Sequence, residues 1–143
     1  MKAKVFVRIL SLFILVQILI VGTGVVASAN NCKDTAVTYN FVNDYIRSTN
    51  GGRVKTDYSH SYQKCTSAPS GYSYISWVDG ANSEYSDVWA DVSRGHRYTF
   101  TSGTTYWMLN WVKESGYSYA CMMAKSSDGR SFTATALWSP DSV

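Results

Sequence analysis

Two histidines are the residues in this sequence best suited to acid–base chemistry or to activating a nucleophile. His60 lies in an alternating stretch, in phase with Tyr58 and Tyr62, and His96 follows a glycine at the start of another such stretch. The G-x-S-x-G turn that carries the serine of many hydrolases does not occur. A histidine within a strand more often packs or forms a hydrogen bond than acts as a base. We therefore rank a hydrolase that uses His60 or His96 below the binding functions considered next.

Paired carboxylates could support glycoside hydrolysis, and clustered carboxylates could bind calcium. Glu84 and Glu114 are the only glutamates, and both lie in turn-like segments. Asp79 and Asp87 lie in a polar stretch that lacks the ligand spacing of a calcium-binding loop. We expect the aspartates to occupy turns or solvent-facing positions. Because there is also no C-x-x-C pair for zinc and no glycine-rich phosphate loop, the sequence predicts no catalytic residue, no metal site and no cofactor.

Exposed aromatic rings are the remaining candidates for function, because amphipathic rings are common at binding surfaces and can stack on sugars. All 11 tyrosines and all 5 tryptophans follow residue 29. Trp89 lies between Asp87 and Asp91 and alternates with aliphatic residues. If the aliphatic side is the core, this ring is exposed beside two carboxylates; the alternative is that it packs under a loop. We predict three ligand-binding residues, which are Trp77, Trp89 and Tyr106.

The segments that would position these side chains have the alternating pattern of short strands, and turn residues separate them. In residues 53–63, Val54, Tyr58 and Tyr62 share a face that we expect to point inward. Residues 35–42 also fit helical spacing. The pattern predicts an all-β fold, a small antiparallel β-sandwich or barrel of about seven or eight short strands after an N-terminal signal helix. The predicted strands are Thr35–Val42, Arg53–Gln63, Tyr72–Val78, Ser86–Val92, His96–Thr101, Thr105–Val112, Tyr117–Ala124 and Ser131–Trp138.

The first residues have the order of a secretory signal peptide. A basic start over residues 1–8 precedes an apolar run over residues 9–26, and a triplet with Ala27 and Ala29 at its small positions follows. We predict cleavage after Ala29, which divides the chain into a signal peptide at 1–29 and a single secreted β domain at 30–143. The alternative is an uncleaved N-terminal anchor, because the apolar run approaches the length that spans a bilayer.

Cleavage changes the charge of the protein. The sequence has 13 basic and 10 acidic residues, and three of the basic residues lie in the predicted signal peptide, so residues 30–143 carry no net charge. A neutral domain has no long-range attraction for nucleic acid or for an anionic membrane. We therefore expect no nucleic-acid partner and no stable membrane anchor after cleavage. The expected partner is a cell-wall polysaccharide or another extracellular surface.

Three cysteines in an exported chain predict one disulfide and one free thiol. Cys32 lies near the new N-terminus and Cys65 lies where a strand meets a loop, so both are in segments flexible enough to meet. Cys121 lies in an apolar segment suited to a buried thiol. Of the three possible pairings, we favour Cys32–Cys65.

Three segments resemble a group of small secreted proteins of unknown function from Gram-positive bacteria, mainly bacilli. They are Gly51–Thr56, Tyr106–Tyr117 and Ala136–Val143. The resemblance implies export and a β-rich single domain, and it transfers no active-site residue. We expect a secreted, non-enzymatic β-sandwich that binds an extracellular or cell-wall ligand. The alternative is a secreted antimicrobial (bacteriocin-like) or inhibitory protein.

Overall fold

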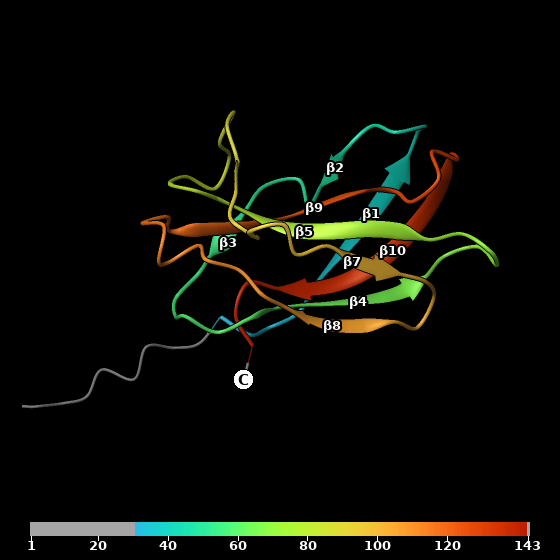
Figure 1. Ribbon diagram of the computed structural model, residues 1–143. Coiled ribbons are helices and arrows are strands. Elements are labelled where there is room, and N and C mark those ends of the chain that lie inside the picture. The colour runs from blue at the N-terminus through green and yellow to red at the C-terminus, as the bar shows by residue number, and fades with distance from the viewer. Residues whose placement is uncertain (1–30, 143) are drawn as a thin grey trace, which may run out of the picture.

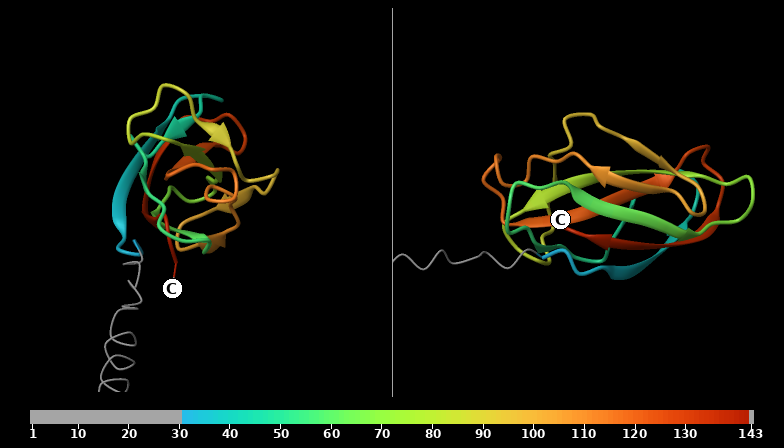
Figure 2. Two further views of the ribbon diagram at one scale, coloured as in Figure 1. Left: turned by 90° about the vertical axis from the view of Figure 1, so that its left-hand side faces the viewer. Right: turned by 90° about the horizontal axis from the view of Figure 1, so that it is seen from below.

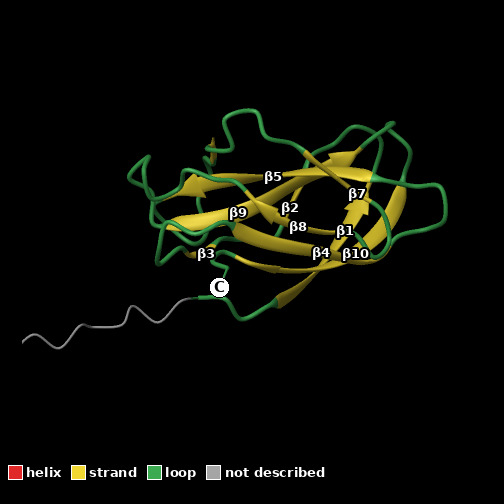
Figure 3. Cartoon of the chain, turned by 60° about the horizontal axis from the view of Figure 1, so that its bottom comes forward, coloured by secondary structure: helices red, strands yellow, loops and turns green. Residues whose placement is uncertain are grey.

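The structure is a computed structural model that describes residues 31–142. The predicted signal peptide, with its cleavage residues Ala27 and Ala29, lies outside the described residues. Within residues 31–142 every regular element is a strand, which confirms the all-β prediction (Figure 3). None of these residues belongs to a helix that is long and apolar enough to cross a membrane.

Four antiparallel strands form one sheet, in the order β1-β10-β4-β8 (Figure 1). Their bounds are Thr35–Phe41 for β1, Ser61–Ser67 for β4, Thr105–Met108 for β8 and Phe132–Ser139 for β10. β1 pairs with β10 over its whole length, from Thr35 opposite Trp138 to Phe41 opposite Phe132. β1 and β8 are therefore the two edges of this four-stranded sheet.

The other sheet has six strands, four of them very short. β9 (Tyr119–Ser126) and β5 (Tyr74–Ala81) pair along their whole length at its centre. β2 (Arg47–Ser48) and β3 (Arg53–Val54) pair with β9, whereas β6 (Ala90–Asp91) and β7 (Tyr98–Phe100) pair with β5. The predicted strand over residues 86–92 is thus reduced to β6. No ladder joins the two sheets among the described residues, so the sandwich is the correct choice of the two expected architectures.

The sheets pack face to face around a core that is largely aromatic. Tyr74 on β5 stacks on Phe100 of β7 with ring centroids 5.1 Å apart, and its ring also lies 5.6 Å from Tyr39 and 5.4 Å from Phe41 of β1. All four side chains are buried. Offset and tilted ring pairs stabilise a core beyond the burial of their area. This cluster links the two sheets and explains why Tyr39 and Phe41 alternate with polar residues in β1.

The predicted strand over residues 53–63 is wrong in both extent and phase. Only β3 and the start of β4 are strands there, and the residues between them form a loop. Tyr58 is 71% exposed, whereas Lys55 is buried. In β4 the side chain of Gln63 points inward and donates a hydrogen bond to the Tyr39 hydroxyl at 3.0 Å. A polar residue can occupy this inner position because its amide nitrogen has a partner there, although the Gln63 Oε1 atom has none among the described residues.

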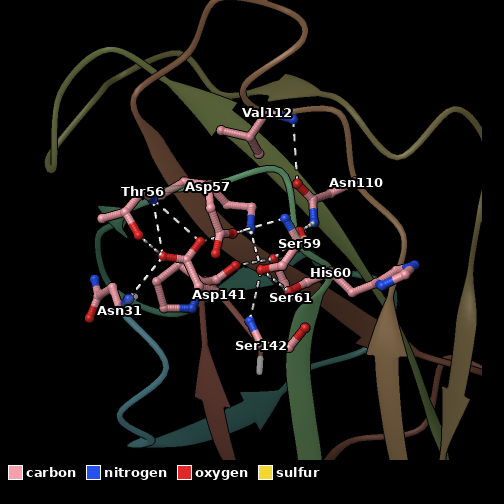
Figure 4. A network of polar contacts seen from close by, with 12 residues as sticks. Asn31, Thr56, Asp57, Ser59, His60, Ser61, Asn110, Val112, Asp141 and Ser142 are labelled. Atoms are coloured by element: carbon pink, nitrogen blue, oxygen red, sulfur yellow. Dashed lines mark hydrogen bonds and ion pairs between the residues drawn. The ribbon is translucent and has the colours of Figure 1, made fainter. Parts of the chain in front are cut away.

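The two ends of the described chain lie at the same end of the sandwich (Figure 2). The carboxylate of Asp141 accepts hydrogen bonds from the backbone N–H groups of Asn31 and Thr56 and binds the ammonium of Lys55 at 2.8 Å (Figure 4). Lys55 and Asp141 are both buried. One carboxylate therefore holds the first described residue, the segment after β3 and the C-terminal residues together.

The structure does not contain the predicted Cys32–Cys65 disulfide, since all three cysteines are free in it. Cys65 points into the core between the sheets. Cys32 lines a hollow on the opposite side of the four-stranded sheet, together with Tyr62. Cys121 lies on β9, where its thiol is 3.1 Å from the hydroxyl of Thr49. Cys65 and Cys32 thus lie on opposite faces of the four-stranded sheet, and Cys121 lies in the six-stranded sheet.

Candidate functional site

The outer face of the four-stranded sheet is open to solvent and carries a regular array of mostly polar side chains. Strand geometry places alternate residues of β1, β10, β4 and β8 on this face. In the array, the hydroxyls of Thr66 and Thr135 are 2.7 Å apart, and Thr133 donates to the side chain of Asn40 at 3.0 Å. The array consists of Ala36, Thr38, Asn40, Tyr62, Lys64, Thr66, Thr105, Trp107, Thr133, Thr135 and Leu137.

Trp107 stands at one end of this array and is 58% exposed. It is the one tryptophan among the large exposed hydrophobic residues of the described chain. Trp107 on β8 lies opposite Tyr62 on β4, and the two rings meet edge to face with centroids 6.0 Å apart. The Tyr62 contact holds one edge of the indole and leaves much of the ring open to solvent. A rigid, exposed ring of this kind is a suitable surface for stacking a planar or sugar-like ligand.

A hollow of about 240 Å³ lies beside this ring pair. Its other lining residues are Cys32, Asp34, Ser139, Asp141 and Ser142. Asp34 is exposed and supplies carboxylate oxygens that can accept hydrogen bonds from hydroxyl groups. The Asp141 carboxylate is already engaged: burial alone would raise the pKa of Asp141, but hydrogen bonds from Lys55 and Thr56 outweigh it and lower the pKa. Only Asp34 is therefore available as an acidic contact in this hollow.

The structure does not bring the predicted ligand residues Trp77, Trp89 and Tyr106 together. Trp77 is 7% exposed, and the guanidinium of Arg97 lies 4.5 Å above its ring. Trp89 packs on Gly52, where an added Cβ would lie only 2.3 Å from the indole. Tyr106 packs against the core, with its ring 5.1 Å from that of Phe100. Trp89 thus follows the alternative considered for it, which is packing against a neighbouring loop.

The histidines and the carboxylates do not form a catalytic cluster in the described residues. His60 is exposed, and His96 stacks on Trp111 with ring centroids 5.7 Å apart. Neither histidine forms an ion pair within residues 31–142. No group of three or more possible metal ligands occurs in this part of the chain.

The expectation that the aspartates face solvent is wrong for two of them. Asp141 is fully buried, and Asp79 is 6% exposed with one carboxylate oxygen that has no hydrogen-bond partner. Asp79 on β5 lies directly opposite Asp91 on β6. Burial, together with the nearby negative charge of Asp91, raises the pKa of Asp79 to about 6. Asp79 belongs to the six-stranded sheet, so it is not part of the outer face of the four-stranded sheet.

Trp107 was missed because alternation alone does not say which side of a strand is inside. In residues 105–112 both alternating sets contain aromatic or large apolar residues, so both sides could be core. The structure places Met108 and Asn110 inside and Trp107 outside. The hydrogen bonds of the Asn110 amide, which reach Ser61 and the backbone of Ser59, show why a polar residue can take the inner position. The polar Asn110 belongs to the same alternating set as Met108, so the sequence pattern favours the wrong face and gives no signal that could have identified Trp107.

A family model described as a protein of unknown function, DUF2712, matches residues 25–142. The match covers all of the described sandwich, including both sheets, the outer-face array and the hollow beside Trp107. No curated protein shows significant similarity to the chain. No solved structure shows significant similarity to it either.

Proposed function

The chain belongs to the DUF2712 family of unknown function, and we propose from the geometry of its outer face that it is a secreted, non-enzymatic module that binds cell-wall polysaccharide. The observation that carries the proposal is the exposed Trp107 ring, held edge to face by Tyr62 at the end of an open polar sheet face. A glycan chain offers both apolar ring faces and many hydroxyl groups, and the outer face offers a matching combination.

The fit can be followed along the face. Trp107 would stack on one sugar ring, and the neighbouring Asp34 would accept hydrogen bonds from its hydroxyls. The rows of threonine and asparagine beyond Tyr62 would accept and donate hydrogen bonds to the sugars that follow. The absence of net charge in residues 30–143 suits a neutral glycan, which needs no electrostatic attraction.

The test is binding of purified residues 30–143 to insoluble peptidoglycan, chitin and cellulose in sedimentation assays. We expect at least one of these polymers to retain the parent protein. Trp107→Ala should weaken that binding by about tenfold or more, because an aromatic hot-spot residue contributes about 2 kcal/mol or more. Tyr85→Ala is the matched control. Tyr85 is 77% exposed, but it lies on the loop that follows β5, a strand of the six-stranded sheet.

Two results would overturn the proposal. One is that none of the polymers retains the folded parent protein. The other is that Trp107→Ala binds as well as the parent while remaining folded by circular dichroism. Clearing zones on lawns of related bacteria, with no polymer binding, would favour the antimicrobial function instead.

A further inference from the structure

A second concave feature lies at the β1 edge of the sandwich, between β1 and β2, and shares Ala36, Thr38 and Asn40 with the outer-face array. This groove has a volume of about 610 Å³, which is within the range of known ligand sites. Most of its lining is polar, with Val42 and Ile46 as exposed apolar residues. The lining residues are Ala36, Val37, Thr38, Asn40, Val42, Ile46, Arg47, Ser48, Thr49 and Asn50.

The groove lies between two open strand edges. Within residues 31–142, β1 pairs only with β10 and β2 pairs only with β9. Alternate residues of an edge strand direct their backbone N–H and C=O groups away from the sheet. β1 has none of the features that usually block edge pairing, because its seven residues include no charge, no proline and no register shift against β10. The groove therefore offers main-chain hydrogen-bonding groups at the spacing of a strand.

The opposite side of the sandwich is closed. There β7 and β8 meet through the rings of Tyr98, Phe100 and Tyr106, and the Tyr98 hydroxyl accepts a hydrogen bond from the backbone N–H of Leu109. No ring contact joins β1 to β2 among the described residues, because the rings of Tyr39 and Phe41 on β1 pack inward on Tyr74. The space between β1 and β2 is thus lined mainly by polar groups, whereas aromatic side chains fill the space between β7 and β8.

Arg47 supplies the charge of the groove. Its Nε atom is buried and has no hydrogen-bond partner among the described residues, and no described carboxylate forms an ion pair with its guanidinium. Every other side chain that lines the groove is neutral. An arginine fork binds a carboxylate through two parallel hydrogen bonds. The groove therefore contains one positive charge, and no described residue of the chain provides a carboxylate to pair with it.

We propose that this groove binds an extended acidic peptide, which adds to β1 as an extra strand and places a carboxylate on Arg47. A peptide satisfies the open main-chain groups of the strand edge, and a glycan lacks the matching repeat of N–H and C=O groups. A second copy of β1 satisfies the edge, but its residues Thr35–Phe41 carry no carboxylate and leave Arg47 without a partner. An acidic strand satisfies both requirements. This inference does not depend on polysaccharide binding by the outer face.

The probe is a synthetic peptide as long as β1, seven residues, of alternating threonine and valine with glutamate as its last residue. It is titrated into isotope-labelled residues 30–143 and followed by NMR. We expect saturable shifts of the backbone amides of residues 36–42 and 46–50. Replacing glutamate by glutamine and amidating the C-terminus should weaken binding by about tenfold or more, because charge-assisted hydrogen bonds are lost. N-methylation of alternate peptide residues should abolish binding.

Arg47→Gln should weaken binding of the acidic peptide by the same factor, and it should leave the affinity for the neutral peptide unchanged. Arg94→Gln is the matched control, because Arg94 is exposed and lies over Trp111; it should bind as the parent does. If Arg47→Gln is unfolded, the comparison of the acidic, neutral and methylated peptides on the parent protein still tests the proposal. Shifts outside the groove, equal binding of the methylated peptide, or self-association that perturbs the same amides without peptide would overturn it.

Discussion

At the scale of single residues, the buried pair of Lys55 and Asp141 connects segments that are far apart in the sequence. The Asp141 carboxylate accepts hydrogen bonds from three residues, Asn31, Lys55 and Thr56, and Thr56 donates through both its backbone and its side chain. The Lys55 ammonium also lies 3.5 Å from the carboxylate of Asp57. Removing one member of a buried pair leaves the other charge buried without its closest partner, and this costs more than the pair itself contributes to stability.

We expect Asp141→Ala to lower the free energy of unfolding by about 3–5 kcal/mol, because it leaves Lys55 buried and removes the acceptor for Asn31 and Thr56. Urea unfolding of residues 30–143, followed by tryptophan fluorescence, measures the change. The control is Asp128→Ala, which removes an exposed pair with Arg130 and should leave the urea midpoint almost unchanged. Equal effects of the two substitutions would contradict the structural role of Asp141.

At the scale of elements, the entry into β3 depends on a close contact between a loop and a strand. The N–H of Gly52 donates to the carbonyl of Glu84 at 2.7 Å, which ties the β5–β6 loop to the start of β3. Trp89 from the same loop packs directly on Gly52. A side chain at position 52 would meet both the Trp89 indole and, at 3.0 Å, the backbone carbonyl of Ala120. The glycine is therefore required for space.

Gly52→Ala should destabilise the protein by about 1–3 kcal/mol, as other overpacked sites do. In the Trp89→Ala background the same change should cost clearly less, because the indole that it displaces is gone. A double-mutant cycle from urea unfolding measures this coupling. Additive effects of the two substitutions would show that the ring does not limit the space at Gly52.

At the scale of the whole molecule, two buried aspartates make stability depend on pH in opposite directions. The pKa of Asp79 is raised from 3.8 to about 6, so between these values the folded protein holds a proton that the unfolded chain lacks. Stability from this group therefore falls as pH rises through that window. The pKa of Asp141 is lowered, so its contribution is present above the ordinary aspartate pKa and is lost in more acidic solution.

Asp79→Asn should remove the loss of stability between pH 3.8 and about 6. Above that window we expect the variant to be more stable than the parent by roughly 1–3 kcal/mol, because it no longer buries a carboxylate facing Asp91. At pH near 4 the two proteins should differ much less. Urea unfolding at a series of pH values measures both curves, and curves that run parallel across the window would contradict the assignment to Asp79.

The amino-acid sequence by itself determined the all-β class. It also predicted a strand over residues 35–42, where Tyr39 and Phe41 alternate with polar residues, but helical spacing fitted the same residues and only the structure decided for β1. It determined less where both sides of a strand carry rings or where polar residues have buried partners. Only the tertiary structure decided that Trp107 faces solvent, that Trp77 and Tyr106 are covered, and that Lys55 is inside. The physical reason is that alternation gives the period of a strand, whereas its inner face depends on partners far away in the chain, such as Asp141 for Lys55.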